Sequence, residues 1–343
     1  MHDALPVNFG PLAVPFRWDR GVHDSPRVYK PHQRRRRPSL FFSPSLFPMK
    51  RIHTVADMHA HIRTRHAAGD RCALVPTMGA LHDGHLALVR NALDRADHVT
   101  VSIFVNPTQF APDEDLDDYP RTLDADCETL NALGVDAVFA PSVEEMYPFA
   151  SSDAQPDTLT WVTVDRLTNT LCGAYRDGHF RGVTTVVTKL FNACRPDVAV
   201  FGTKDAQQFV VLKHMTKELR FGIDIVGVPT VREDDGLALS SRNQYLSASE
   251  REQATVLYDA VTTARTHIEQ GTHTAATIEN AMHAALARAP DADVQYASVV
   301  DAETLQPLDT LPPGRDVLAA VAVFFGDTRL IDNAFATSPS DTA

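Results

Sequence analysis

The sequence has no long hydrophobic run and no excess of basic residues. None of its apolar stretches approaches the about 20 consecutive residues that a membrane-spanning helix needs, so we expect no membrane partner. The 343 residues carry a formal net charge of −12, which argues against a nucleic acid bound through a general basic field. Hydrophobic residues make up 44% and charged residues 22%, so a chain that is disordered throughout or fibrous is also excluded.

Cysteine is scarce as well. The four cysteines are Cys72, Cys127, Cys172 and Cys194, and no two of them form a C-x-x-C motif. Widely spaced single cysteines in a chain of this length predict buried thiols rather than a disulfide framework. We therefore expect a reducing, cytoplasmic location.

Hydrophobic periodicity is absent from residues 1–48. This segment holds eight of the 22 prolines and eight Lys or Arg residues against three Asp, which predicts a disordered basic tail. It is not a secretory signal, because no apolar core of the required length follows the arginines. A targeting segment and an interaction arm are alternatives to an upstream translation start, which we favour because Met49 begins the patterned part of the chain.

From Ile52 onward, short apolar runs alternate with helical periods. The expected helices span 55–68, 85–96, 119–133 and 184–193, and the expected strands span 72–75, 99–105, 137–140, 160–164, 198–201 and 223–231. The runs are apolar throughout rather than alternating, which is typical of strands buried on both faces. The fold class is therefore α/β, with a parallel sheet that has helices on both faces.

The composition shifts to alanine-rich helix after Asn243. Ser247 and Glu250 predict a capping box, and Gly271 fits the end of the helix that follows. A second helix at 275–287 and strands near 294–300, 317–325 and 328–331 complete a smaller C-terminal α/β domain. We expect domains at 49–235 and 236–336, with a frayed end at 337–343.

The stretch from Val75 to His85 joins a buried strand to a helix. Pro76 and Gly79 interrupt the apolar pattern, so the chain turns there. His82 and the histidine three residues later therefore lie just outside the carboxyl end of a strand, where open α/β sheets bind ligands. The helix N-terminus favours an anion such as phosphate, and residues three apart can aim both imidazoles at one ligand.

Two other interpretations of this histidine pair stay open. One histidine can cap the helix while the other lies on the surface. A metal pair is also conceivable, but no further Cys or His lies close by at zinc-like spacing.

Two further polar clusters can serve the same edge of the sheet. Lys204 follows the strand-end residue Gly202, where a flexible cation can reach a phosphate, and Asp205 can cap the next helix. Two serines and an arginine at 240–242 can clamp a phosphate. The alternatives are a surface lysine in a loop and an ordinary turn between domains.

Five stretches in this order resemble the pantothenate synthetase (pantoate–β-alanine ligase) family of the HxGH nucleotidyltransferase superfamily. They are Pro76–His85, Ser102–Pro107, Gly178–Val183, Lys204–Gln208 and Leu239–Asn243. The chain is similar to this family from Met49 to about Asn333. The resemblance implies a Rossmann-like sheet with a smaller C-terminal domain that closes over the site.

The resemblance also implies the reaction. ATP, pantoate and β-alanine would give pantothenate, AMP and pyrophosphate through a pantoyl-adenylate, with Mg²⁺ as cofactor, in coenzyme A biosynthesis. Relatives imply a homodimer. The alternatives are another HxGH nucleotidyltransferase and a catalytically weakened nucleotide-binding relative.

Site residues are carried over position by position. The implied ATP contacts are Met78, Gly79, Ala80, Leu81, His82, Asp83, Gly84, His85, Gly202, Thr203, Lys204, Asp205, Val231, Leu239, Ser240, Ser241 and Arg242. Gln109 and Gln208 are implied to hold pantoate and β-alanine. Catalysis is assigned to His82, His85 and Lys204, with His85 as the usual proton donor.

Other positions have less defined roles. Arg176 and His179 lie in a matching stretch near the site, and Asp126 matches a residue that helps to hold Mg²⁺ in some relatives. The metal ligands stay unassigned. The chain departs from the family pattern at Thr108, Cys172, Thr203 and Ala206, which bears on the shape of the substrate pocket.

Overall fold

The computed structural model describes residues 49–111, 116–117, 119–149 and 158–340. The predicted basic tail at 1–48 lies outside these residues. In the described part of the chain, no helix is both long and apolar enough to cross a membrane.

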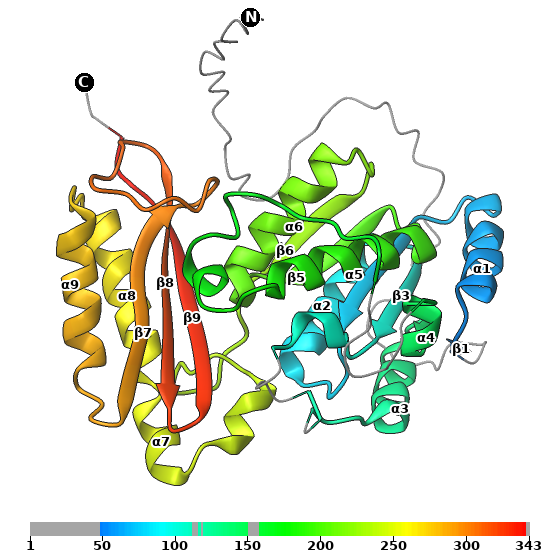
Figure 1. Ribbon diagram of the computed structural model, residues 1–343, viewed down its shortest axis with the longest axis horizontal. Helices are drawn as coiled ribbons and strands as arrows, with labels where there is room; N and C mark the ends of the chain where they lie inside the picture. Colours follow the sequence, from blue (N-terminus) through cyan, green and yellow to red (C-terminus); the bar gives the residue numbers. More distant parts are fainter. Residues whose placement is uncertain (1–48, 112–115, 118, 150–157, 341–343) are drawn as a thin grey trace, which may run out of the picture. The chain divides into compact units, whose positions relative to one another are not determined.

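Six parallel strands form the larger sheet, in the order β1-β4-β3-β2-β5-β6 (Figure 1). The strands are β1 (Lys50–Ile52), β2 (Cys72–Thr77), β3 (His98–Ile103), β4 (Ala137–Phe139), β5 (Val198–Gly202) and β6 (Asp224–Val228). The helices that connect them are α1 (Val55–Ala67), α2 (Asp83–Arg95), α3 (Leu123–Leu133), α4 (Val143–Met146), α5 (His179–Cys194) and α6 (Ala206–Glu218). The predicted α/β class with a parallel sheet is confirmed.

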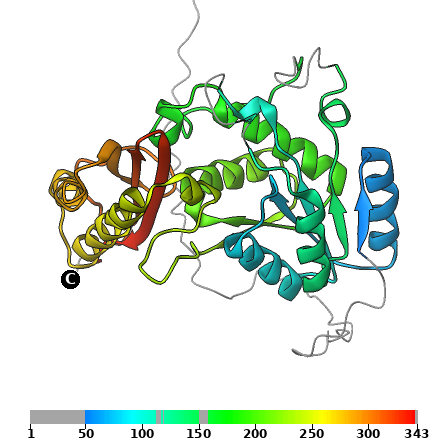
Figure 2. The same cartoon turned by 90° about the horizontal axis from the view of Figure 1, so that it is seen from below.

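Helices cover both faces of this sheet (Figure 2). Val75 of β2 and Val101 of β3 belong to a core with Val89 of α2 and Leu130 of α3 on one face. Helix α5 contacts both α1 and α6, and each of these three helices also contacts β2 or β5. Burial of both faces explains why the strands are apolar without alternation.

The predicted strand at 160–164 is wrong. This segment runs along α5, and its backbone bonds go to threonine side chains of that helix rather than to a strand. Val162 N donates to Thr185 Oγ1 over 3.0 Å, Thr184 Oγ1 donates to Val162 O, and Trp161 packs under the Arg181 guanidinium. Its β-branched and aromatic residues therefore reflect packing on a helix.

The C-terminal part contains the second sheet, which is antiparallel in the order β7-β8-β9. Its strands are β7 (Ala292–Asp301), β8 (Asp316–Phe325) and β9 (Thr328–Thr337), and its helices are α7 (Ala248–Gln253), α8 (Val256–Glu269) and α9 (Ala275–Leu286). The Ser247–Glu250 capping box is confirmed. The single helix expected before Gly271 is instead divided, because α7 ends at Gln253, with Ala254 as its C-cap, before α8 begins at Val256.

Alternation along β8 gives this sheet two different faces. Val317, Ala319 and Val321 pack into the core with α8 and α9. Leu318 and Ala320, which point the other way, line the pocket described below. The C-terminal sheet therefore contributes one wall of that pocket.

The expected frayed end at 337–343 is wrong for its first two residues. Thr337 still pairs with Asp316 and donates to its carboxylate over 2.6 Å, and Ser338 is buried. Residues 341–343 lie outside the described part.

The four cysteines are free, three of them buried and Cys172 half-buried. The boundary between residues 235 and 236 stays a prediction.

Candidate active site

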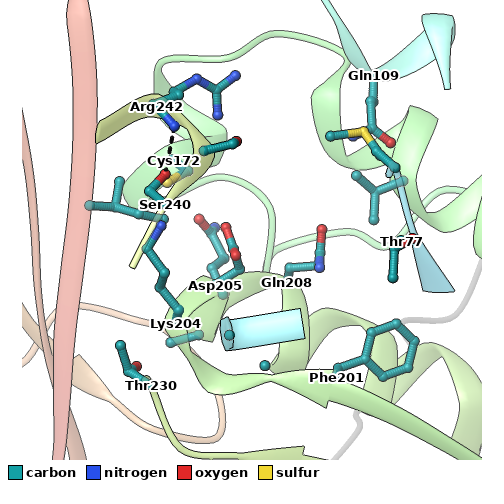
Figure 3. A pocket seen from close by; sticks show the side chains of 18 of the residues that line it. Thr77, Gln109, Cys172, Phe201, Lys204, Asp205, Gln208, Thr230, Ser240 and Arg242 are labelled. Atoms are coloured by element: carbon teal, nitrogen blue, oxygen red, sulfur yellow. Dashed lines mark hydrogen bonds between the residues drawn. The ribbon is translucent and has the colours of Figure 1, made fainter. Parts of the chain in front are cut away.

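A cavity of about 310 Å³ lies at the carboxyl ends of β2 and β5. The turn after β2, the segment after β5, a loop near residue 240 and strands β8 and β9 line it. Lys204 and Gln109 approach it from different elements, and Figure 3 shows the Lys204 amine reaching toward Ser240. This is the sheet edge where parallel α/β folds bind ligands.

The turn after β2 is a tight left-handed turn. Gly79 and Ala80 have φ values of +84° and +50°, and a Cβ at Gly79 would lie 3.1 Å from Asp126 Oδ2. The buried Asp126 carboxylate accepts from Ala80 N at 3.0 Å and from Leu81 N at 2.9 Å. One carboxylate that accepts two backbone hydrogen bonds therefore holds the segment that precedes the histidine pair.

The two histidines cap α2 with each other. His82 Nδ1 accepts from Gly84 N over 3.1 Å, and His85 Nδ1 accepts from His82 N over 3.3 Å, which is a reciprocal capping box. The ring centroids are 4.1 Å apart and the rings are inclined by 39°. Both histidines line the pocket, so capping and ligand binding, which the sequence left as alternatives, are compatible.

These hydrogen bonds assign the tautomer. An Nδ1 that accepts a hydrogen bond carries no proton, so each neutral ring has its proton on Nε2. Burial, His82 and Lys204 lower the pKa of His85 to about 3, and burial followed by Lys204 lowers the pKa of His82. Near neutral pH the pair therefore offers two uncharged Nε2–H donors. The low pKa of His85 therefore favours hydrogen-bond donation by its Nε2–H group over the full transfer of a proton to the substrate.

Lys204 lies in a short 3₁₀ turn, η3 (Thr203–Asp205), directly after β5. Burial lowers its pKa, although Asp205 and Asp332 act in the opposite direction. Asn333 of β9 donates from Nδ2 to Thr203 O at 3.0 Å and to Lys204 O at 2.7 Å. The C-terminal sheet thus fixes the backbone that carries the lysine.

Asp205 does not cap α6, contrary to our prediction. It occupies the N-cap position, but its side chain makes no capping hydrogen bond and instead lines the pocket. Its backbone ψ of 64° lies outside the extended region that N-cap residues usually adopt.

The serine–arginine cluster forms the loop that enters η4 (Ser241–Tyr245). Ser240 Oγ accepts from Arg242 N at 3.3 Å (Figure 3). Asn243 secures the loop by donating to Glu233 Oε1 and Ala238 O. Ser240, Ser241 and Arg242 line the pocket, as do Val231 and Leu239.

Gln109 and Gln208 line the same pocket, from η1 (Pro107–Gln109) and the first turn of α6 respectively. His179 Nδ1 donates to Gln109 O at 2.8 Å, and Arg176 Nη1 donates to His179 Nε2 at 3.0 Å. His179 is therefore the Nδ1–H tautomer. It joins Arg176 to the backbone of the glutamine, and both residues line the pocket.

Among the described residues that line the pocket, five of the implied ATP contacts do not appear: Gly79, Ala80, Leu81, Asp83 and Thr203. The first three form the turn that Asp126 holds. Asp83 is exposed at the start of α2, and Thr203 Oγ1 donates to Val228 O at 3.2 Å, which joins the ends of β5 and β6. The turn residues and Thr203 thus support the site without lining the pocket.

Asp126 has little capacity left for a metal ion, because Thr122 Oγ1 also donates to its carboxylate over 3.1 Å. In the part of the chain that the structure describes, a metal-compatible group is formed by His66, Cys72 and Asp197. Cys72 begins β2, whereas the pocket lies at the other end of that strand. This group is therefore separate from the pocket.

Several lining residues were not selected from the sequence. Asn106, only 1% exposed, donates from Nδ2 to Gln109 Oε1 at 3.1 Å. Tyr296, Arg329, Asp332 and Asn333 come from β7 and β9. The buried polar pair in the middle of β9 was a usable signal, because it interrupts an otherwise apolar pattern.

Comparisons with known proteins agree with this geometry. The sequence model described as pantoate–β-alanine ligase matches residues 50–335. A pantothenate synthetase from Salinibacter ruber is 67% identical over 291 residues, which are 85% of this chain and 99% of that relative.

Two solved structures are similar along most of their length. The pantothenate synthetase from Thermus thermophilus is 45% identical with a TM-score of 0.75, and the match covers 83% of this chain and 99% of that one. The pantoate–β-alanine ligase from Francisella tularensis, complexed with β,γ-ATP and β-alanine, is 32% identical with a TM-score of 0.66 and coverages of 83% and 97%. The chain belongs to the pantoate–β-alanine ligase family.

Proposed function

We propose that this chain condenses pantoate with β-alanine in an ATP-dependent reaction that yields pantothenate, AMP and pyrophosphate through a pantoyl-adenylate. The observation that carries this proposal is the convergence of His82, His85, Lys204 and the Ser240–Arg242 loop on one pocket. Family membership supports it, as does the Francisella tularensis relative, which was solved with an ATP compound and β-alanine.

In the first step, a carboxylate oxygen of pantoate attacks the α-phosphorus of ATP. The bond from this phosphorus to the bridging oxygen of pyrophosphate breaks in line with the attack. Negative charge develops on the phosphoryl oxygens, and fixed donors at that point stabilise the transition state. The Nε2–H groups of His82 and His85 are such donors, and their mutual capping bonds hold them in place before ATP binds.

Lys204 supplies the mobile positive charge. Its ammonium is partly desolvated before ATP binds, which lowers its pKa, and an incoming phosphate restores a partner for the charge. The Ser240–Arg242 loop adds a guanidinium and hydroxyl donors on the same side. Together these groups neutralise the triphosphate.

Gln109 and Gln208 orient pantoate. An arginine that paired with the pantoate carboxylate would blunt it as a nucleophile, whereas neutral amides orient the carboxylate and hydroxyls without that penalty. In the second step, the β-alanine amine attacks the acyl carbon of the adenylate, the acyl–oxygen bond breaks and AMP leaves. The C-terminal wall of the pocket helps to keep water from the adenylate.

Mg²⁺ is part of the proposal. This cation prefers oxygen ligands and is usually held by one or two carboxylates together with substrate phosphates. Among the described residues that line the pocket, the carboxylates are those of Asp205 and Asp332, and Asp332 is bound to Arg232 on both oxygens, so Asp205 is the described ligand that fits. When bound, Mg²⁺ would neutralise the leaving pyrophosphate.

We further propose a homodimer, as the family resemblance implies, and a cytoplasmic location, which the free cysteines support.

The decisive test is ATP–pyrophosphate exchange by the full chain, with pantoate present and β-alanine omitted. We expect exchange that requires pantoate, and AMP release that requires both pantoate and β-alanine. A nucleotidyltransferase of another specificity would join the nucleotide to its substrate without needing β-alanine. A nucleotide-binding relative without activity would bind ATP and show no exchange, and either result would overturn the proposal.

A further inference from the structure

A buried set of polar side chains adjoins Gln109: Asn106 lines the pocket, and Thr108 and Tyr147 lie behind it, outside the lining. Tyr147 follows α4 and is 2% exposed, and Asn106 is 1% exposed. Tyr147 OH donates to Asn106 Oδ1 over 2.6 Å, and Thr108 Oγ1 lies 3.1 Å from both of these oxygens. A buried polar network is destabilising unless each donor and acceptor has a hydrogen-bond partner. This requirement fixes the orientation of each side chain in the network.

The network determines which way the Asn106 amide points. Its nitrogen Nδ2 donates to Gly182 O at 3.3 Å and to Gln109 Oε1 at 3.1 Å. A backbone carbonyl only accepts, so this end of the amide must be the NH₂ group. The other end must then be the oxygen, which is the atom that Tyr147 OH requires as its acceptor.

The same logic fixes Gln109. Its Oε1 is occupied by Asn106, so its NH₂ group faces the other way and lies 3.1 Å from Met78 Sδ. Both Gln109 and Met78 line the pocket. A thioether is a weak acceptor, so a stronger oxygen acceptor can displace it. Gln109 thus presents N–H donors, which match the carboxylate or a hydroxyl oxygen of a hydroxy acid.

The Tyr147 ring is held independently of its hydroxyl. The Lys189 ammonium lies 4.7 Å from the ring centroid while donating to Met146 O at 2.8 Å, and the Phe104 ring lies 6.4 Å away. Burial raises the pKa of Tyr147 to about 12, so the hydroxyl keeps its proton and remains a donor throughout the working pH range.

We propose that Tyr147 is a positioning residue for pantoate: its hydroxyl orients Asn106, which in turn orients the Gln109 amide with its N–H groups toward the substrate. This inference rests on the proposed function. Tyr147 does not touch the substrate in this scheme, and its effect passes entirely through Gln109. A purely structural role would instead stabilise the fold and affect all substrates alike.

The test replaces Tyr147 with phenylalanine in the full chain, which keeps the ring contacts and removes only the hydroxyl. In pantoate-dependent pyrophosphate exchange, we expect KM for pantoate to rise by about fivefold, the equivalent of one neutral hydrogen bond, while KM for ATP stays within about twofold. Tyr258→Phe, on α8, is the matched control and should leave both constants unchanged. The thermal midpoint of each variant is measured alongside.

A second experiment tests whether the effect of Tyr147→Phe on pantoate depends on Gln109. In a Gln109→Ala background, Tyr147→Phe should add no more than about a twofold loss in kcat/KM for pantoate, because the amide it orients is gone. An equal rise in both KM values, or an undiminished effect in the Gln109→Ala background, overturns the inference. Wild-type protein without pantoate-dependent exchange would refute the proposed function instead. Active wild type with an unaffected Tyr147→Phe variant would refute this inference alone.

Discussion

At the scale of single residues, His82 and His85 each have two roles, in capping α2 and in presenting a donor to the pocket. Each ring uses Nδ1 to satisfy a backbone N–H at the start of α2 and keeps Nε2–H for the pocket. Burial is the largest factor that opposes a positive charge on these rings, and the nearby Lys204 adds to it. Uncharged donors follow from this environment, whereas the sequence alone suggested only that two imidazoles share a face.

The protonation state gives the first prediction. Because the folded pKa of His85 is about 3, below its ordinary value of 6.5, the unfolded chain binds a proton that the folded chain does not between these pH values. The contribution of His85 to stability is therefore complete above about pH 6.5 and is lost as the pH falls toward 3. NMR of the imidazole nitrogens should show an unprotonated Nδ1 for His85 from pH 5 to 8. A titration midpoint inside that window would contradict the assignment.

Gln109 gives the second prediction. In Gln109→Arg, the guanidinium would pair with the pantoate carboxylate, so binding of pantoate should stay measurable by calorimetry while the rate of adenylation falls sharply. Pantoate-dependent exchange measures that rate. A variant with unchanged exchange would show that charge pairing does not blunt this nucleophile, and the argument for neutral amides would fail.

At the scale of elements, the turn between β2 and α2 depends on a carboxylate far along the chain. Asp126 of α3 accepts the two backbone N–H groups that precede His82. Ala80 adopts a positive φ of 50°, which is unfavourable for a residue with a Cβ and needs support from its surroundings. Asp126 supplies that support.

The third prediction separates this role from metal binding. Asp126→Asn loses an acceptor, because one amide end would face a backbone donor with an NH₂ group. We expect a loss of stability of about 1–3 kcal/mol and a lower exchange rate, with the Mg²⁺ dependence of the reaction unchanged. Urea unfolding and a Mg²⁺ titration of the exchange rate measure the two effects. A raised Mg²⁺ requirement at full stability would assign Asp126 to the metal instead.

The element scale also shows how far sequence reasoning reaches. Hydrophobic periodicity predicted β2, α2 and β5, and the residue types at Ser247 and Glu250 predicted the capping box. Both kinds of signal are local in the sequence. It failed at 160–164, where β-branched residues pack on α5 rather than in a sheet. The contributions of Asn106 and Asn333 were missed for a related reason. The polar interruption in β9 marks Asn333 but not its partners Thr203 O and Lys204 O, which only the tertiary fold brings close. Asn106 contacts Gln109 three residues away, but its orientation depends on Tyr147 OH and Gly182 O, which lie far along the chain.

At the scale of the whole described molecule, the pocket is complete only when both sheets contribute. The turn after β2 and the turn after β5 supply the donors, and β8 and β9 supply the opposite wall. Arg232 and Asp332 form a bidentate pair at 2.6 and 2.9 Å across one part of this junction. Asn333 joins η3 to β9 next to it. Substrate binding and sheet packing therefore depend on some of the same residues.

The last prediction tests this dependence at Asn333. Asn333→Asp keeps the shape of the side chain but replaces the donor to Thr203 O and Lys204 O with a carboxylate, which would face two carbonyl oxygens. The turn that carries Lys204 should lose its fixed geometry, so we expect kcat/KM for ATP to fall by about tenfold or more, since removing a donor that contacts the transition state directly costs about a hundredfold or more.

A matched control on the same strand separates this effect from general damage to β9. Thr337→Val also removes a hydrogen bond, from Thr337 Oγ1 to Asp316 Oδ1 at 2.6 Å, but at the end of the strand remote from η3. Urea unfolding of both variants gives their free energies of unfolding, and pyrophosphate exchange gives the kinetic constants. If β9 positions Lys204, the two variants lose comparable stability while Asn333→Asp alone loses ATP-dependent activity. Equal loss of activity in both would mean that β9 merely supports the fold.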